Sequence, residues 1–295
     1  MEAFALENSI NPFNEAVSYE TLWAIDGMTE KKLSELFKNS NGLPSEVLNS
    51  FMGLVPNPEI VQLKNDVSTY LLKKLQSVAV CVNSTIQYPE QLRRAEHPIE
   101  LFYYKGNLDL LSLRSLSIVG AREASEEGIR RAKKLSSGLV EAGFCIVSGL
   151  AKGIDKAAHD AAIASKGKTI GVIGTPIDKY YPKEHQPLQD YIARNHLLVS
   201  QVPFYRYQHE NFHNHKFYFP RRNSTMAAIS EATIIVEASD TSGSLTQARA
   251  CLEHQKKKLF ILESCFQRKD IKWPHTYEKR GAIRVRDIKD ILDNL

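Results

Sequence analysis

Arginine and lysine residues stand beside glycine, serine and aromatic residues at three places in this sequence. Residues 119–122 read V-G-A-R, residues 148–155 read S-G-L-A-K-G-I-D, and residues 219–223 read F-P-R-R-N. Glycines just after strands allow backbone N–H groups to approach an anion, and guanidinium groups bind phosphate oxygens through two parallel hydrogen bonds. These residue types therefore predict a phosphate-binding site.

Arg221 and Arg222 give the sharpest form of this argument. The preceding proline suits the start of a helix, but two arginines in a first turn oppose the helix dipole by about a few tenths of a kcal/mol each. A bound anion would reverse this effect. Pairing with a carboxylate such as Glu237 is the alternative. Because Arg122 and Lys183 are expected at the same edge of the fold, phosphate binding is the preferred interpretation.

The elements that must position these residues alternate between strands and helices. Because the strands are apolar at consecutive positions, helices should cover both faces of the sheet. The pattern predicts an α/β fold, with an extended Rossmann-like, mostly parallel sheet and helices on both faces. Apolar runs place the strands near residues 116–120, 144–148, 169–174, 197–200, 233–237 and 258–262.

Ligands of open parallel sheets bind at the carboxyl ends of the strands, so the residues that follow each strand should form the site. Residues 120–125 read G-A-R-E-A-S, which differs from the dinucleotide pattern G-x-G-x-x-G, and no acidic ribose ligand is evident after the next strand. NAD is therefore not predicted, and no cofactor is expected.

Residues 1–80 are predicted to form a small helical module with a linker helix, ahead of a main domain over residues 81–295. Pro12 argues against a long helix in the first fifteen residues, and helical periodicity begins at Tyr19. Residues 25–33, I-D-G-M-T-E-K-K-L, have the shape of a SAM-like or helix-hairpin-helix module. Such modules contact DNA or protein, and a cap that stabilises the main domain is the equal alternative.

Charge is unevenly divided along the chain. Residues 1–80 carry 6 lysines, no arginine and 10 acidic residues, whereas the remainder is basic and favours a polyanionic partner. The composition, 43% hydrophobic and 24% charged, is typical of soluble globular proteins. The sequence shows no signal peptide or membrane span, so we expect a cytoplasmic protein whose four cysteines are reduced packing residues.

Two other groups of residues could do chemistry. Asp155 and His159 lie four apart on a predicted helix and could act as acid and base, but helix capping by Asp155 and packing of His159 explain them better. His209, His213 and His215 resemble metal ligands, yet no cysteine or second cluster accompanies them. No catalytic residue and no metal site are predicted.

These motifs resemble the DNA-processing protein A family, also called DprA/Smf. The segments that match in order and spacing are 119–122, 148–155, 181–183 (Y-P-K), 219–223 and the E-A-x-x-x-S-G-S-L that begins at Glu237. The resemblance implies a Rossmann-like protein that binds single-stranded DNA, catalyses no reaction and forms a homodimer. It further implies transfer of the strand to a RecA-type recombinase during DNA recombination or DNA uptake in competence and natural transformation.

The resemblance also implies which residues contact DNA. They are Arg122, Ser148, Gly149, Lys152, Lys183, Arg221, Arg222, Asn223, Ser242, Gly243 and Ser244. Cations and backbone amides along a groove would give salt-dependent affinity without sequence preference. Core packing is the more common role of nearby aromatic residues, but base stacking could come from Tyr180, Tyr181, Phe204, Tyr205, Phe217 and Phe219.

The sequence departs from the family pattern at several positions. Ala121 stands where serine is common, and Lys152 keeps the charge of the usual arginine without its bidentate geometry. Ser224 and Ala228 replace an arginine and a glycine, which could weaken or redirect DNA binding. Many members carry a C-terminal winged-helix module, and none is expected here.

Two alternatives belong to other classes of protein. Phosphoribohydrolase-like enzymes use comparable glycine loops to hold a nucleotide, but they have P-G-G-x-G-T-x-x-E where residues 238–248 read A-S-D-T-S-G-S-L-T-Q-A. The catalytic glutamate is missing there, which counts against an enzyme. A nucleotide-sensing module that signals to a partner is the other alternative.

Overall fold

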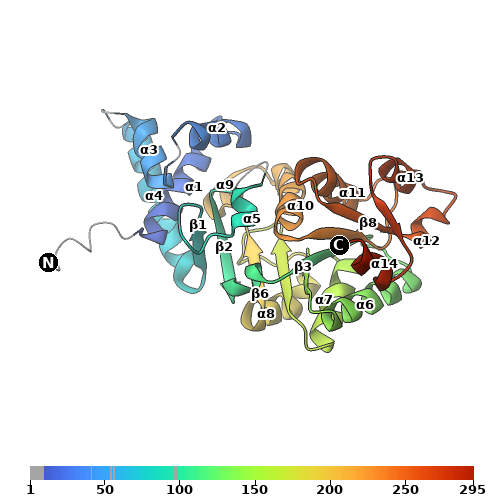
Figure 1. Ribbon diagram of the computed structural model, residues 1–295. Helices are drawn as coiled ribbons and strands as arrows, with labels where there is room; N and C mark the ends of the chain where they lie inside the picture. Colours follow the sequence, from blue (N-terminus) through green and yellow to red (C-terminus); the bar gives the residue numbers. More distant parts are fainter. Residues whose placement is uncertain (1–9, 41, 54, 56, 96–98) are drawn as a thin grey trace.

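A nine-stranded sheet forms the centre of the protein in a computed structural model that describes residues 10–40, 42–53, 55, 57–95 and 99–295 (Figure 1). The strand order is β1-β2-β6-β5-β4-β3-β7-β8-β9, and all pairs from β6 to β9 are parallel. The strands are β1 Ala79–Val82, β2 Leu101–Gly106, β3 Ser115–Val119, β4 Cys145–Ser148, β5 Thr169–Ile173, β6 Leu197–Ser200, β7 Ala232–Ile235, β8 Lys258–Leu262 and β9 Ile283–Val285.

The six strands predicted for the main sheet lie within two residues of their expected bounds, so the Rossmann-like fold is confirmed. Strands β3, β4, β5, β6 and β7 are buried along their whole length, which explains their consecutive apolar residues. Strand β9 was not predicted, because this strand has only three residues and is partly exposed. Strands β1 and β2 extend the other end of the sheet by antiparallel pairing.

The order in which the chain adds strands to the sheet reverses between the neighbouring parallel strands β3 and β7. From β3 the chain proceeds through β4 and β5 to β6 on one side, and it then crosses to β7 and continues to β8 and β9 on the other. The loops that follow β3 and β7 therefore diverge at the carboxyl edge. In open α/β sheets this point is where ligands bind.

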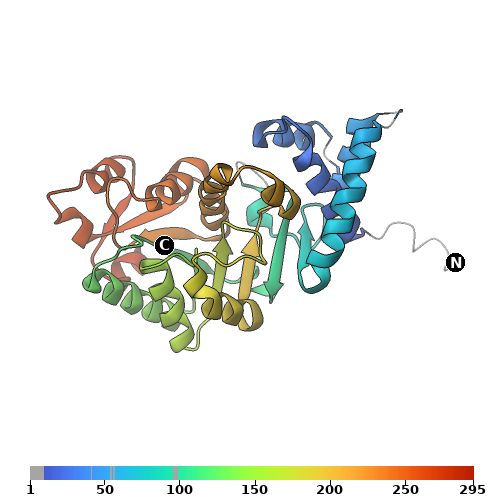
Figure 2. The same cartoon turned by 180° about the vertical axis from the view of Figure 1, so that it is seen from behind.

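Helices cover both faces of the sheet, as Figures 1 and 2 show from opposite sides. One face carries α6 (Glu126–Glu141), α7 (Ile154–Ala164), α8 (Gln186–Asn195) and α14 (Ile288–Asp293). The other face carries α5 (Glu90–Arg93), α10 (Tyr218–Ile229), α11 (Ser244–Arg249), α12 (Glu263–Phe266) and α13 (Trp273–Glu278).

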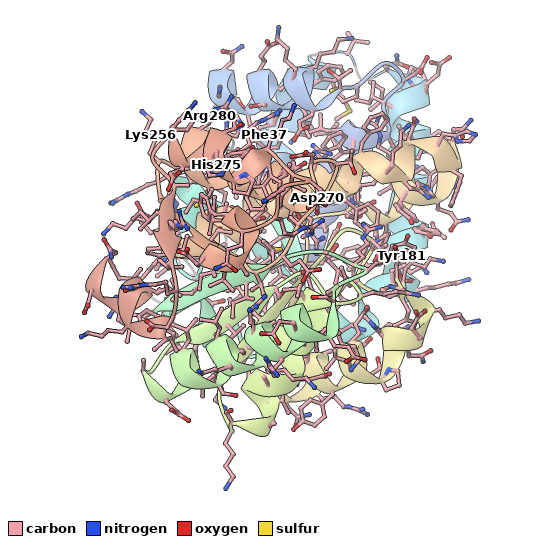
Figure 3. All side chains as sticks on the ribbon, turned by 90° about the vertical axis from the view of Figure 1, so that its right-hand side faces the viewer. Phe37, Tyr181, Lys256, Asp270, His275 and Arg280 are labelled. Carbon is pink, nitrogen blue, oxygen red and sulfur yellow. The ribbon has the colours of Figure 1, made fainter. Side chains whose placement is uncertain are left out.

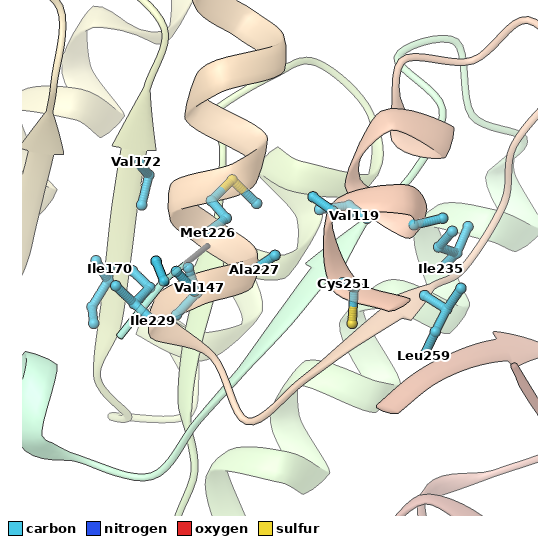
Figure 4. Packing of buried hydrophobic residues seen from close by; sticks show 14 of the residues in the cluster. Val119, Val147, Ile170, Val172, Met226, Ala227, Ile229, Ile235, Cys251 and Leu259 are labelled. Atoms are coloured by element: carbon cyan, nitrogen blue, oxygen red, sulfur yellow. The ribbon is translucent and has the colours of Figure 1, made fainter. Parts of the chain in front are cut away.

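Helix α10 is fixed by apolar packing on the middle of the sheet (Figure 4). Met226 and Ala227 are buried on α10, and they belong to one cluster with Val147, Ile170 and Val172 of the strands below. All four cysteines are buried and unpaired, in agreement with the sequence analysis. The amino end of α10, where F-P-R-R-N begins, is therefore held at a fixed place over the carboxyl edge.

The N-terminal module contains α1 (Pro12–Ala24), α2 (Glu30–Ser40), α3 (Pro44–Met52) and α4 (Pro58–Lys74). The expectation that Pro12 argues against a long helix in the first fifteen residues was wrong at residues 12–15, and residues 1–9 lie outside the described part of the chain. Pro12 occupies the first helical position, where the missing N–H would have no partner in any case. The side chain of Asn11 caps this helix by accepting from Phe13 N and Asn14 N at 3.0 and 3.3 Å. Thr29, directly before α2, accepts from Lys32 N at 3.3 Å, as an N-cap residue does.

A buried carboxylate joins this module to the sheet. Glu20 on α1 is completely buried, and it accepts hydrogen bonds from the hydroxyl of Tyr103 (2.5 Å), Phe204 N (2.7 Å) and Tyr205 N (2.6 Å). The two amides belong to the first turn of α9 (Phe204–His209), which follows β6. Burial raises the pKa of Glu20 to about 7, although all three hydrogen bonds oppose this shift.

We predict that Glu20 makes the stability of the protein depend on pH. Its pKa in the folded protein lies above the ordinary value of 4.5, so the folded state binds the extra proton first, and wild type gains stability as pH falls from about 7 to 4.5. Relative to Glu20→Gln, the gain should reach up to about 1.4 kcal/mol per pH unit. Urea unfolding at pH 5, 6 and 8 measures this difference, with exposed Glu59→Gln as the control. Parallel pH profiles for wild type and Glu20→Gln would contradict the assignment.

Candidate nucleic-acid interface

The segments with predicted site residues meet at the carboxyl edge of the sheet. Strand β3 leads into Arg122, β4 into residues 148–153, β5 into residues 174–183, and β7 into residues 237–244. The amino end of α10 lies over the same edge. The structure therefore brings together segments that are far apart in the sequence.

Gly153 brings the loop after β4 directly against the loop after β3. Its φ angle is +71°, and a Cβ atom there would lie 2.3 Å from the carbonyl oxygen of Ala121 and 2.6 Å from that of Arg122. The following residue, Ile154, donates from its backbone N to Ala121 O at 3.2 Å. A side chain at position 153 would therefore push the two loops apart.

Arg222 is buried beneath these loops. Its side chain donates to the carbonyl oxygens of Gly149 at 2.6 Å and Val172 at 3.0 Å, which links α10 to the ends of β4 and β5. A Cβ atom on Gly149 would lie 1.5 Å from the guanidinium, so the glycine makes room for it. With Arg222 only 6% exposed, the structure does not present it for the phosphate contact expected from the sequence.

Asp155 balances the charge of Arg222. It is 4% exposed and accepts from Gly149 N at 3.1 Å. Burial raises the pKa of Asp155 while the charge of Arg222 opposes that shift, and burial lowers the pKa of Arg222. Asp155 was expected to cap α7. The N-cap residue of this helix is instead Gly153. The amide of Gly149 is used within the protein rather than left open to an anion.

Arg122 and Lys183 are exposed at this edge, where two aromatic rings are in contact with each other. The guanidinium of Arg122 lies 5.8 Å from the ring centre of Phe219, and Phe219 lies 5.4 Å from Tyr181. Lys183 is exposed two residues after Tyr181, whose side chain is 52% exposed. Neither Arg122 nor Lys183 forms an ion pair with any residue that the structure describes. Figure 3 shows Tyr181 well apart from Arg280 near the C-terminal end.

Lys152 lies close to the same rings but has a partner. Its ammonium group is 2.5 Å from Glu184, and both side chains are more than half exposed. The hydrogen bond to Glu184 raises the pKa of Lys152, and the charge of Tyr181 contributes in the same direction. Because an exposed pair contributes little to stability, a bound phosphate can replace Glu184 at low cost.

Arg221 faces the N-terminal module instead of the exposed edge. It donates to Glu30 of α2 at 2.6 Å, and its guanidinium lies 4.6 Å from the ring centre of Trp23. It lines a groove of about 720 Å³ between the module and α10, whereas Arg122 and Lys183 do not. The sequence analysis proposed a carboxylate partner as the alternative to phosphate. The structure provides one, but it is Glu30 and not Glu237.

The remaining predicted contacts differ in how accessible they are. Ser148 is buried and donates to Ile118 O at 2.7 Å, and buried Asn223 donates to Gly243 O at 3.2 Å. Asn223 therefore supports the 242–244 loop from below. Within that loop the hydroxyl groups of Ser242 and Ser244 are 2.9 Å apart; Gly243 is exposed and Ser242 is partly exposed, whereas Ser244 is buried. Among these predicted contacts, Ser242 and Gly243 are therefore accessible to a ligand, and Ser148, Asn223 and Ser244 are not.

Glu237, which follows β7, occupies the amino end of α6. Its two carboxylate oxygens accept from Ser125 N and Oγ at 3.0 and 2.6 Å. A Cβ atom on Gly128 would lie 2.2 Å from the same carboxylate, so the glycine in the first turn lets Glu237 approach. Dinucleotide-binding folds place a pyrophosphate at the corresponding helix end. Here an internal carboxylate takes that position.

Sequence reasoning missed the roles of Glu237 and of the Asp155–Arg222 pair. A glycine in the first turn of α6 and an acidic residue directly after β7 were the available signals for Glu237. Among the residues that the structure describes, no group of three or more His, Cys, Asp or Glu side chains could hold a metal ion. His159 is buried and bonded to Thr169 at 2.7 Å, in agreement with the packing role expected for it.

The fold defines a Rossmann-like protein. Its carboxyl edge lacks the dinucleotide-binding pattern G-x-G-x-x-G and carries exposed cations and aromatic rings. Residues 79–295 match the family described as DNA recombination-mediator protein A. The chain belongs to this family, as its motifs predicted. The DNA processing protein DprA of Streptococcus pneumoniae is 43% identical over 205 residues, which cover 70% of each chain. That of Bacillus subtilis is 32% identical over 242 residues, or 79% of each chain.

Solved structures agree with this assignment. The X-ray structure of DprA from Streptococcus pneumoniae has a TM-score of 0.77 and 29% sequence identity, and the match covers 97% of this chain and 98% of that one. DprA from Helicobacter pylori, described for its single-stranded DNA binding mode, has a TM-score of 0.61 and 26% identity. That match covers 74% of this chain and 94% of the other. In the described part of the present chain, no helix is long and apolar enough to cross a membrane.

We predict that Arg222→Met lowers the free energy of unfolding by about 3 kcal/mol, because it leaves Asp155 buried without a counter-charge. Arg222→Met with Asp155→Asn should cost less than the sum of the two single changes, because each removes the same interaction. Chemical denaturation of the four proteins measures the coupling. Arg130→Met, at a side chain that is 77% exposed, should change stability by less than about 0.5 kcal/mol. Additive effects of the two buried substitutions would show that the residues do not interact.

Proposed function

We propose that this protein binds single-stranded DNA along the carboxyl edge of its sheet and catalyses no reaction. The observation that carries the proposal is that exposed Arg122 lies against Phe219, that Phe219 is in contact with Tyr181, and that exposed Lys183 follows Tyr181 by two residues. Cations and aromatic rings on one surface suit a strand that alternates phosphates and bases. Membership of the family, and the single-strand binding described for the Helicobacter pylori protein, support it.

Each predicted contact has a specific place in this proposal. Arg122 and Lys183 bind phosphates directly, and Lys152 does so by exchanging its exposed partner Glu184 for a phosphate. Ser242 and Gly243 supply hydroxyl and amide donors, and buried Ser244 holds the hydroxyl of Ser242. The other predicted residues act from below or from the side by positioning these groups, namely Ser148, Gly149, Arg221, Arg222 and Asn223.

The wider role follows from the family. We propose that the bound strand passes to a RecA-type recombinase in DNA recombination or uptake, as in competence and natural transformation, and that the protein acts as a cytoplasmic homodimer. In this proposal residues 1–80 form a separate module that caps the main domain over residues 81–295. The carboxylate of Glu20, bonded to Tyr103 and to the amides of α9, is the contact that supports such a cap.

A mononucleotide enzyme or sensor remains the alternative class. A small nucleotide phosphate would be expected at the amino end of α6, which Glu237 occupies through two hydrogen bonds to Ser125. Calorimetry with nucleoside monophosphates against oligonucleotides separates the two classes. Binding of mononucleotides as tight as that of a strand, or release of free base from them, would favour the alternative.

We predict that Arg122→Ala with Lys183→Ala weakens binding to oligo-dT and makes it less dependent on salt. Each lost phosphate contact to a single strand removes about 0.7 from the slope of log K against log salt, so the double variant should lose about 1.4. Fluorescence anisotropy at several salt concentrations measures both quantities. The charge-matched control is Lys133→Ala with Lys168→Ala, because Lys168 precedes β5 at the opposite edge. If both double variants lost affinity equally, net charge rather than this edge would account for binding.

A further inference from the structure

Exposed aromatic rings also occur in the turn that leads into α10. The 3₁₀ turn Phe212–Phe217 carries Phe212 with 79% of its surface exposed and Phe217 with 60% exposed. Single exposed apolar residues are common on protein surfaces, whereas this six-residue turn carries two large exposed rings. Neither ring contributes to a hydrophobic core cluster.

Phe212 is mounted on a stack of rings that reaches the protein interior. It meets His215 edge to face at 5.3 Å, and His215 stacks on Tyr207 at 3.6 Å with an interplanar angle of 11°. Tyr207 in turn lies 5.7 Å from Tyr218, which is buried. The ring of His215 also bonds to Tyr207 O at 2.9 Å. Because these contacts hold the turn in place, Phe212 can receive a ligand with little loss of conformational freedom.

The turn is continuous with the proposed DNA edge. Phe217 lies two residues before Phe219, and the ammonium group of Lys216 is 5.3 Å from the ring centre of Phe217. Tyr207 of the ring stack lies 5.7 Å from Tyr218, the residue directly before Phe219, so the stack packs against the start of α10. A cation beside exposed rings suits a polyanion with aromatic bases better than it suits an apolar protein surface.

We propose that Phe212 and Phe217 form a second stacking platform, on which bases of the same single strand continue beyond Phe219. This inference rests on the proposed function and adds to it the direction in which the strand leaves the edge. The flat rings bind bases of any sequence, since every base offers a face for stacking.

The experiment compares wild type with Phe212→Ala/Phe217→Ala on a long oligo-dT. Stacking corresponds to a factor of roughly 5 or more in affinity for each base, so the double variant should bind about 25-fold more weakly or worse. Phe212→Tyr/Phe217→Tyr keeps both rings and should bind like wild type. Phe51→Ala, at an exposed ring on α3, is the matched control and should also leave binding unchanged. Circular dichroism establishes that each variant is folded.

A second strand tests whether the rings bind bases. It has the same length, but the half that would cover the turn consists of abasic sites. Wild type and the alanine variant should bind this strand equally, because the phosphates remain and the bases are gone. A variant that is equally weakened on both strands, or on neither, would overturn the inference. If wild type does not bind oligo-dT, or if Arg122→Ala with Lys183→Ala leaves binding intact, the proposed function itself fails. Loss of a protein partner without loss of DNA binding would assign the turn to protein docking instead.

Discussion

The buried guanidinium of Arg222, bonded to the carbonyl oxygens of Gly149 and Val172 and balanced by the charge of Asp155, supports the arrangement of this edge. A guanidinium in the interior must have its charge balanced and its donors satisfied, and Asp155 together with two backbone carbonyls meets most of this requirement. The contact fixes the amino end of α10 to the ends of β4 and β5. Phe219 is therefore held against Gly174, where a Cβ atom would lie 2.8 Å from its ring. The exposed rings and cations thus stand on a rigid base.

Much of this fold could be predicted because local patterns determine it. The strands were found from apolar runs, and the edge of the site followed from their parallel order. The start of α1 was not found, because the sequence rule that excludes proline from helices does not apply at the first helical position. Strand β9 has three residues, too few for periodicity to show.

The site was only partly predictable, because neighbouring arginines on a helix point in different directions. Successive residues turn by about 100°, so Arg222 enters the interior while Arg221 faces the N-terminal module. Their partners come from remote parts of the chain, and Glu30 is 191 residues from Arg221. A sequence motif records that two cations are present but not which of them is buried. The separation of supporting from exposed cations therefore required the three-dimensional arrangement.

The same edge also shows how a Rossmann-like fold can favour a polymer over a mononucleotide. In nucleotide-binding members of this fold, the positive end of a helix is left open for one phosphate group. Here Glu237 fills that end through Ser125, while the cations that remain exposed lie around aromatic rings on an open surface. In the proposed complex, a strand would engage several of these cations and rings together. The affinity of such an edge would rise with the length of the ligand, which is the property that a protein handling DNA strands requires.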